Sequence, residues 1–305
     1  MSAIRVTGLR KRYGDLEAVR GIDFEVAEGE CFALLGPNGA GKTTTVEILE
    51  GYRDRDAGQV EVLGFDPQRG GRDLRERVGI VLQSSGHFRE LTVSEVLELF
   101  GGYYPRPRAT GEVIDLVGLG DKAGARVKTL SGGQQRRLDL ALGLVGDPDL
   151  LFLDEPTTGF DPSARRRSWE LIESLRELGK TILLTTHYMD EAQNLADRVA
   201  IINAGRIVAA GTPDSLGGRD EGEAVIAFRL PAGTPLDGLP AGLPGRPVQH
   251  EDRVELRTSE PTRALHALTG WALDREETLD ALTVTRPSLE DVYLQLTSAE
   301  EPTHA

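Results

Sequence analysis

The chain has 305 residues, of which 39% are hydrophobic, and this length allows one large domain with its own core and a smaller second domain. Its formal net charge of −14 disfavours electrostatic binding to DNA, RNA or an anionic membrane surface. Cys31 is the only cysteine, which excludes internal disulfides and cysteine-based metal sites, and no apolar stretch approaches the roughly 20 residues that a membrane-spanning helix needs.

A phosphate-binding loop is predicted near the start of the chain. Two strand-like segments, 4–12 and 17–26, precede an apolar run, Cys31–Leu35, that predicts a buried strand. The next residues fit the pattern G-x-x-x-x-G-K-[ST] between that strand and a helix that begins near Lys42. In such a loop, backbone N–H groups and the positive end of the helix attract phosphate oxygens. The candidate nucleotide-binding residues are Gly36, Pro37, Asn38, Gly39, Ala40, Gly41, Lys42, Thr43 and Thr44.

Two residues of this loop have specific expected roles. We expect Lys42 to reach the β- and γ-phosphates of a nucleotide, and Thr43 to ligate Mg²⁺. For this pattern alone, the alternative is a Gly-rich turn before an ordinary helix.

The middle of the chain changes from a strand pattern to a helical one. An apolar run over 78–83 predicts a strand that ends at Gln83, and residues 88–149 then follow a helical pattern. Thr92 and Glu95 predict a capping box at the start of one of these helices.

A second Gly-rich motif, Leu130-Ser-Gly-Gly-Gln-Gln-Arg-Arg137, precedes a predicted helix over 134–145. Ser131, Gly132, Gly133 and Gln134 offer a hydroxyl and a helix N-terminus to an anion. Because one nucleotide site does not need both motifs, we expect the second motif to serve nucleotide that is bound by another molecule.

Two carboxylates follow a buried strand. The apolar run Leu150–Leu153 ends at Asp154 and Glu155, and adjacent residues at a strand end can point to different sides. We expect Asp154 to hold Mg²⁺ and Glu155 to polarise a water molecule for attack on the γ-phosphate. His187 has the same position after the run Thr181–Thr186, although a single histidine is more often structural than catalytic. Parallel sheets bind ligands at the carboxyl ends of their strands, so these residues are expected to meet at the edge that carries the P-loop.

The last third of the chain predicts a separate small domain. A hairpin over 200–208 is expected to close the first domain, and five prolines between 230 and 247 predict a loop. The predicted domains are 1–216 and 217–305, the second with strands at 224–230, 254–257 and 282–285 and helices at 262–273 and 288–297.

The order of these motifs resembles the nucleotide-binding subunit of ATP-binding-cassette (ABC) transporters over roughly residues 4–216. Leu130–Gln134 resembles the signature motif of that family, Leu150–Pro156 its Walker B strand, and His187 its switch histidine.

The resemblance implies roles for three further residues. Gln83 would be the Q-loop glutamine, a ligand of Mg²⁺ and water, and Tyr13 would stack on adenine. Tyr13 could alternatively pack on its own sheet. Asp161 would be the D-loop aspartate, although Phe160 precedes it where the family usually has leucine.

The resemblance also implies a fold and partners. The fold would be α/β, with a P-loop NTPase (RecA-like) core, an antiparallel β subdomain, an inserted helical subdomain at about 88–149, and the small α+β C-terminal domain. The cofactors would be ATP and Mg²⁺. ATP binding would form a homodimer in which Ser131–Gln134 and Asp161 of one copy contact the ATP of the other. A separate multispan membrane permease, contacted near residues 87–93, would hold the chain at the cytoplasmic face of the membrane, and no nucleic acid would be bound.

Two short segments, 187–192 and 287–297, further resemble drug-resistance exporter ATPases of the daunorubicin type. The leading hypothesis is therefore ATP hydrolysis that drives export of antibiotics or other hydrophobic drugs. One alternative keeps export but changes the cargo to lipid, glycan or peptide. The other is a soluble ABC ATPase that acts on ribosomes or DNA, which the acidic charge and the single set of motifs disfavour.

Overall fold

The computed structural model describes residues 1–81, 88–216, 223–230, 234–250, 253–285 and 293. The chain divides into two compact units, Met1–Pro213 and Asp214–Ala305, whereas the sequence placed this boundary after residue 216. In the part of the chain that the structure describes, each helix is too short or too polar to span a bilayer.

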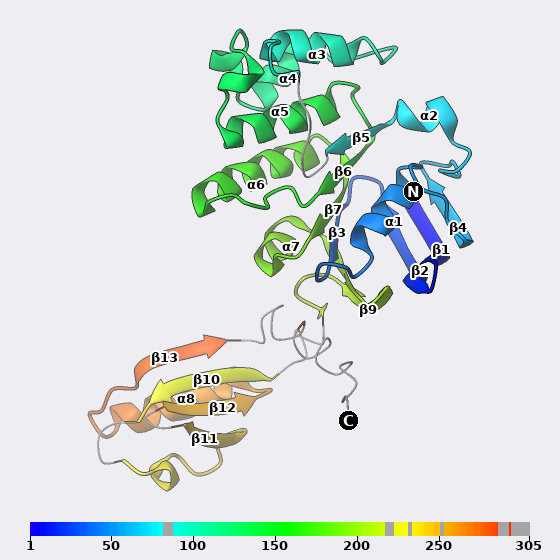
Figure 1. The fold of residues 1–305 in the computed structure, drawn as a ribbon. Helices are drawn as coiled ribbons and strands as arrows, with labels where there is room; N and C mark the ends of the chain where they lie inside the picture. Colours follow the sequence, from blue (N-terminus) through cyan, green and yellow to red (C-terminus); the bar gives the residue numbers. More distant parts are fainter. Residues whose placement is uncertain (82–87, 217–222, 231–233, 251–252, 286–292, 294–305) are drawn as a thin grey trace. The chain divides into compact units, whose positions relative to one another are not determined.

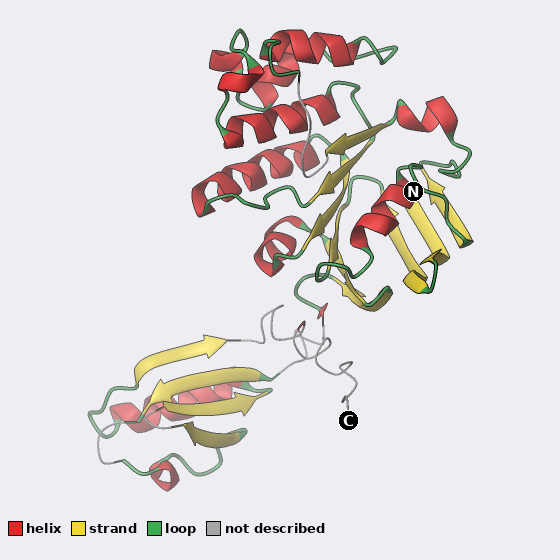
Figure 2. Ribbon diagram, in the orientation of Figure 1, coloured by secondary structure: helices red, strands yellow, loops and turns green. Residues whose placement is uncertain are grey.

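A six-stranded sheet forms the centre of the first unit (Figures 1 and 2). Its strand order is β5-β6-β7-β3-β8-β9; the first five strands are parallel, and β9 is antiparallel to β8. Most of the parallel strands are continuous apolar runs because both faces of the sheet are covered. The strands are β3 (Cys31–Leu35), β5 (Val78–Val81), β6 (Leu150–Asp154), β7 (Thr181–Thr186), β8 (Arg198–Asn203) and β9 (Arg206–Gly211).

The predicted hairpin is present between β8 and β9. Its two-residue turn, Ala204 and Gly205, has φ angles of 44° and 78°. Two consecutive positive φ angles match the right-handed twist of the flanking strands, which is why a small residue followed by glycine suits this turn.

A second, antiparallel sheet and one helix cover one face of the central sheet (Figure 1). Val46 and Leu49 of the helix share a core with Phe32 and Phe152 of the central strands. The sheet has the order β2-β1-β4, and strand β4 was not predicted from the sequence. These elements are β1 (Ser2–Tyr13), β2 (Leu16–Ala27), β4 (Ala57–Val62) and α1 (Lys42–Leu49).

Helices α6 (Pro162–Glu177) and α7 (Met189–Leu195) lie on the opposite side of the central sheet from α1 (Figure 1). Leu171, Ile172 and Leu175 of α6 are buried there. Helix α7 begins two residues after His187, and its short sequence had not been predicted as a helix.

The predicted helical region comprises α3 (Val93–Gly101), α4 (Thr110–Leu116) and α5 (Gly132–Leu144), with two short 3₁₀ turns between α4 and α5. The predicted capping box is present at α3: Thr92 Oγ1 accepts from Glu95 N at 3.2 Å, and Glu95 Oε2 accepts from Thr92 N at 2.8 Å. A short unpredicted helix, α2 (Gly71–Arg75), precedes β5.

The second unit is an antiparallel sheet packed on one helix (Figure 2). Ile226, Phe228, Val254 and Leu256 of the sheet share a core with Ala264 and Leu268 of the helix. In sheet order the elements are β11 (Arg246–His250), β12 (Arg253–Thr258), β10 (Ala224–Arg229) and β13 (Asp280–Thr285), with α8 (Pro261–Leu273).

The loop predicted over 230–247 is too long, because its last two residues belong to β11. Pro247 caused this error, because proline cannot donate a hydrogen bond to a neighbouring strand and therefore indicates a loop. Strand β11 lies at the edge of its sheet, where proline is tolerated. The helix predicted over 288–297 lies outside the described residues, apart from residue 293.

Candidate nucleotide site

The P-loop connects the carboxyl end of β3 to α1. Gly36 N donates to Thr186 O at the end of β7 (3.2 Å). A Cβ atom added to Gly36 would lie 2.2 Å from Ile202 O, and one added to Gly41 would lie 2.5 Å from Ala18 O. Gly41 also has φ of 104°, a conformation that side chains rarely adopt. Neighbouring backbone therefore requires glycine at both positions.

Lys42 lies beneath this loop and is 5% exposed. Its Nζ donates to Gly36 O (2.7 Å) and Pro37 O (3.2 Å) and lies 3.6 Å from Glu155 Oε1. Burial lowers the pKa of Lys42, and the charge of Glu155 opposes that shift. Phosphate oxygens could replace these partners without removing the ammonium from its position.

Glu155 contacts several of the other residues of the site. Its φ of 45° is unusual for a residue other than glycine, and such conformations cluster at functional sites. Oε1 lies 3.2 Å from His187 Nδ1, and Thr158 Oγ1 donates to Oε2 (3.1 Å). Burial raises the pKa of Glu155, but the hydrogen bonds from His187 and Thr158 and the charge of Lys42 outweigh it, so the pKa lies below its usual value. The carboxylate is therefore ionised at neutral pH and able to accept a proton.

Asp154 and Thr43 are the described candidates for holding Mg²⁺, and both line the same cleft. Within the described ranges, no cluster of three or more His, Cys, Asp or Glu side chains could hold a metal ion. A pair of oxygen ligands suits Mg²⁺, which usually combines one or two protein oxygens with phosphate oxygens and water. Gln83, the third predicted ligand, lies outside the described residues.

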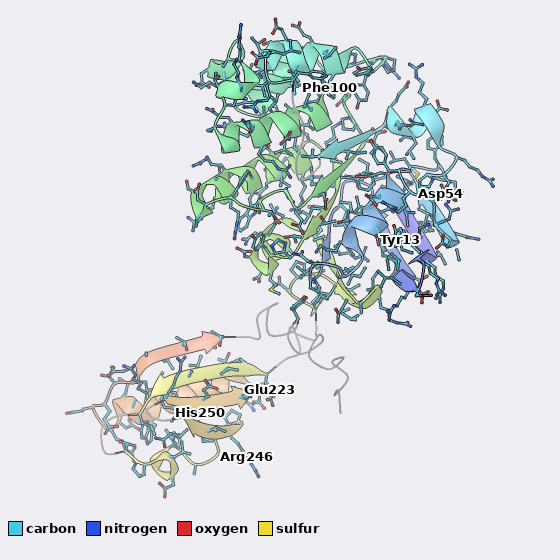
Figure 3. All side chains as sticks on the ribbon, viewed as in Figure 1. Tyr13, Asp54, Phe100, Glu223, Arg246 and His250 are labelled. Carbon is cyan, nitrogen blue, oxygen red and sulfur yellow. The ribbon has the colours of Figure 1, made fainter. Side chains whose placement is uncertain are left out.

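The cleft has a volume of about 450 Å³ and brings together most of the predicted residues. Tyr13, labelled in Figure 3, is 38% exposed, and its ring lies 5.6 Å from Lys11 Nζ and 5.2 Å from Arg53 Cζ. Its ring therefore borders the cleft, beside Lys11 of its own strand. The predicted residues that line the cleft are Tyr13, Pro37, Asn38, Gly39, Gly41, Lys42, Thr43, Thr44, Asp154 and Glu155.

The residues assigned to a second molecule's nucleotide do not line this cleft as far as it is described. Ser131 caps α5: its Oγ accepts from Gln134 N (3.3 Å), and its N donates to Gln134 Oε1 (2.9 Å). A Cβ atom added to Gly132 or Gly133 would meet nothing within 4 Å, so the start of α5 is open. Asp161 caps α6 by accepting two backbone hydrogen bonds of 2.9 and 3.0 Å.

Two residues of the site were missed by sequence reasoning. Thr185 is fully buried; its Oγ1 donates to Asp154 Oδ1 (2.5 Å) and accepts from Glu155 N (3.1 Å). Arg136 is 6% exposed and donates to Asp154 O (3.2 Å) and Pro156 O (3.1 Å), which joins α5 to the loop after β6. The available signals were a hydroxyl inside an apolar strand and an arginine near the end of the second Gly-rich motif.

Comparison with known protein families gives two matches. The ABC transporter family matches residues 19–158, and the C-terminal domain of ABC transporter domain-containing proteins matches residues 224–288. The second match coincides with the sheet and helix of the second unit.

Individual relatives match nearly the whole chain. Daunorubicin resistance ATP-binding protein DrrA3 of Streptomyces coeruleorubidus is 40% identical over 97% of this chain and 96% of its own length. Nod factor export ATP-binding protein I of a Rhizobium species (strain N33) is 42% identical over 98% of both chains. The solved structure of cbiO1 from Clostridium perfringens, part of the ABC transporter complex cbiONQ, is 30% identical, with a TM-score of 0.64 over 70% of this chain and 89% of its own.

The fold, the P-loop and the matches along both units agree. The α/β fold predicted from the motif order is confirmed, as is the antiparallel sheet beside the central one. This chain belongs to the ABC transporter ATP-binding proteins, a family of ATPases.

Proposed function

We propose that this ATPase hydrolyses ATP in the P-loop cleft and thereby drives a separate membrane permease that exports antibiotics or other hydrophobic drugs. The observation that supports the catalytic part is the contact of one carboxylate with two other predicted site residues. Glu155 lies 3.6 Å from Lys42 and 3.2 Å from His187, although the three come from separate segments of the chain.

Each of these residues has a defined part in hydrolysis. Lys42 exchanges its carbonyl partners for oxygens of the β- and γ-phosphates, which releases Glu155 Oε1. Glu155 then accepts a proton from a water molecule whose oxygen bonds to the γ-phosphorus. The bond between the γ-phosphorus and the bridging oxygen breaks, and ADP and phosphate are formed. His187, in contact with the same carboxylate, orients it for this transfer.

Thr43 and Asp154 would hold the Mg²⁺ ion that accompanies ATP. When bound, that ion supplies positive charge to the phosphate oxygens. Thr185 fixes the direction of the Asp154 carboxylate through its hydrogen bond of 2.5 Å.

The open start of α5 supports a homodimer that forms on ATP binding. A helix N-terminus with unobstructed glycines attracts phosphate, yet Gly132 and Gly133 do not line the described cleft of their own chain. We propose that Ser131, Gly132, Gly133 and Gln134 close on the γ-phosphate held by a second copy, with Asp161 nearby.

The names of the relatives support export, and they refer to different compounds. Daunorubicin resistance proteins at 40% identity favour a hydrophobic drug. Nod factor export proteins at 40 to 42% identity keep a different cargo, such as a lipid, glycan or peptide, as the second candidate. A soluble ATPase that acts on ribosomes or DNA is disfavoured by the net charge of −14.

Substitution of Glu155 by glutamine tests the catalytic proposal. Because the amide cannot take the proton, ATP turnover of Glu155→Gln is expected to fall by about 10² to 10⁴-fold, measured as phosphate release. With saturating ATP the variant is expected to double its mass in light scattering. An unchanged rate would remove Glu155 from its role, and a constant mass would contradict the dimer.

The matched control for this experiment is Glu173→Gln on α6. Glu173 is an exposed glutamate far from the P-loop in sequence, and its substitution should leave both readouts unchanged. Cargo is tested by co-expression with the permease in a drug-sensitive host: export of daunorubicin that disappears with Glu155→Gln supports the drug, and unchanged accumulation favours the second candidate.

A further inference from the structure

The imidazole of His187 is held through one of its two nitrogens. His187 follows the end of β7, and its side chain is 29% exposed. Its Nδ1 lies 3.2 Å from Glu155 Oε1, and Nε2 makes no hydrogen bond to a residue that the structure describes. A partly exposed side chain loses conformational freedom when it is kept in one orientation. A histidine that orients Glu155 therefore needs a further contact, on the face of its ring.

Tyr188 supplies that contact. Its ring centroid lies 4.1 Å from that of His187, and the two rings are inclined by 40°. Tyr188 N donates to Thr186 Oγ1 (2.9 Å), which fixes the backbone on both sides of His187. Tyr188 is the N-cap residue of α7, but its side chain makes no capping hydrogen bond. The Tyr188 ring can therefore pack against the imidazole.

Arg165 of α6 contacts the same tyrosine ring. Its Cζ lies 4.4 Å from the Tyr188 ring centroid, which is within the range of a cation–π contact. Nη1 donates to Asp190 Oδ2 on α7 (2.9 Å), whereas Nε is buried without a hydrogen-bond partner in the part of the chain that is described. The guanidinium group thus lies where it satisfies the tyrosine ring and Asp190 at the expense of Nε.

Helix α6 gives Arg165 a fixed base. Asp161 caps the helix, and Arg165 N donates to Asp161 O (3.0 Å) in the first turn. Further along, the buried Ile172 and Leu175 anchor the helix in the core, on the same side of the sheet as α7 (Figure 1). The position of the guanidinium group is therefore set by a helix that is separate from the turn that carries His187.

We propose that Tyr188 and Arg165 are positioning residues for ATP hydrolysis: the Tyr188 ring holds the His187 imidazole against Glu155, and Arg165 holds the Tyr188 ring. Neither residue lines the nucleotide cleft as it is described, so both act through His187 and not on ATP. The inference rests on the proposed role of His187 and adds the contacts that keep its ring in place.

The test is ATP turnover by variants of the full chain, measured as phosphate release over a range of ATP concentrations. Tyr188→Leu removes the ring; kcat should fall about tenfold, and KM for ATP should change less than about twofold, because the P-loop is untouched. Arg165→Met removes the charge, and kcat should fall about threefold. Tyr188→Phe, which keeps the ring, should retain most of the turnover, and Arg165→Lys should retain more than Arg165→Met.

The matched control is Arg176→Met on the same helix. Arg176 forms an ion pair with Asp197, beyond the end of α7, so it also fastens α6 to this part of the chain. Its substitution should lower the thermal midpoint of unfolding without lowering kcat. Asp190→Asn removes the ion pair of Arg165 but not the ring contact, and it should lower kcat less than Arg165→Met does.

A double-mutant cycle with His187→Ala separates positioning from packing. Tyr188→Leu should lower the kcat of wild type about tenfold but that of His187→Ala less than about twofold, because the group that it positions is already absent. Equal effects in both backgrounds would mean that the ring only packs α7 against α6, and would overturn the proposal. Where Tyr188→Leu does not fold, Arg165→Met is compared in the same two backgrounds.

Proton NMR gives a readout that does not depend on activity. The carbon-bound ring protons of His187, assigned by their loss in His187→Ala, should be shifted by the neighbouring tyrosine ring. The shift should remain in Tyr188→Phe and disappear in Tyr188→Leu. Unshifted protons in the wild-type chain would overturn the proposal.

The outcomes separate this inference from the proposed function. If His187→Ala lowers kcat and Tyr188→Leu does not, the positioning role fails and the catalytic proposal stands. If His187→Ala leaves kcat unchanged, the proposed role of His187 fails together with this inference.

Discussion

Two glutamates of the first unit, the buried Glu50 and the partly buried Glu155, have opposite surroundings. Glu155 receives hydrogen bonds from His187 and Thr158 and lies beside Lys42, and its pKa is below the usual value. Glu50 has no such partner among the described residues, and burial with two neighbouring carboxylates raises its pKa to about 8. Glu50 is buried and Glu155 only partly so, and the deeper burial acts together with the lack of donors to raise the pKa of Glu50.

This difference gives the two carboxyl groups different protonation states at neutral pH. Glu155 is charged by contacts within its own chain, which suits a base that must be ready before ATP arrives. Glu50 is kept protonated at neutral pH by burial and by the neighbouring carboxylates. Removing one hydrogen-bond donor or one charge at a time should reduce or enlarge this difference between the two glutamates.

The largest expected effect is on stability and comes from Glu50→Gln. Between the unfolded pKa of 4.5 and the folded value of about 8, the folded protein keeps a proton on Glu50 that the unfolded chain releases. The free energy of unfolding therefore falls as pH rises through this window, and glutamine removes that loss. The free energy of unfolding of the variant should equal that of wild type near the lower end of this pH window. Above the upper end it should be greater by up to a few kcal/mol.

Urea unfolding on the two sides of this pH window measures the difference between the variant and wild type. Glu98→Gln, in the same region but exposed, should show no pH-dependent difference. A stability gain for Glu50→Gln of the same size at both ends would mean that charge burial is not its cause.

Thr185→Val has the next largest expected effect, and it acts on the catalytic carboxylates. Valine keeps the volume but removes the donor to Asp154 and the acceptor of Glu155 N. Since a lost hydrogen bond of this kind is worth about 1–2 kcal/mol, we expect ATP turnover to fall by about tenfold. Phosphate release at saturating ATP measures this change.

Thr181→Val is the matched control for that prediction. Thr181 begins the same strand and is also buried, and its hydroxyl accepts from Gly29 N (3.0 Å), outside the cleft. Thr181→Val should lower the free energy of unfolding by about as much as Thr185→Val does, without lowering ATP turnover. If both variants lose turnover equally, the effect of Thr185 is on the strand and not on Asp154 and Glu155.

Much of the fold and the nucleotide site of the first unit could be predicted, because the same short sequence patterns determine its strands and its site residues. The strands at Cys31, Leu150 and Thr181 are apolar runs with chemistry at their ends, and a parallel sheet brings such ends together. Thr92 and Glu95 were predicted as a capping box because both partners lie within one turn. Local pattern and global fold agree at these places.

What escaped prediction depends on contacts between distant segments. The contacts of Arg136 with β6 and the position of Thr185 beside Asp154 become visible only when the strands are aligned. A pocket of the first unit is lined by residues 50, 75 and 100, among others, which no local pattern joins. In the second unit, Pro247 was predicted to lie in a loop. A strand tolerates proline at this position only because β11 is at the edge of its sheet, and the sequence does not reveal which strand is at the edge.

The smallest expected effect, a shift in pH dependence, tests how Glu155 is kept ionised. His187 and then Thr158 lower the pKa of Glu155. Removing either donor therefore raises this pKa, and the acid limb of kcat/KM, which requires the ionised base, moves to higher pH. His187→Ala should move it further than Thr158→Val, because the contribution of His187 is the larger one. If neither variant moves the limb, the group that titrates in catalysis is not Glu155, and the contrast with Glu50 has no catalytic meaning.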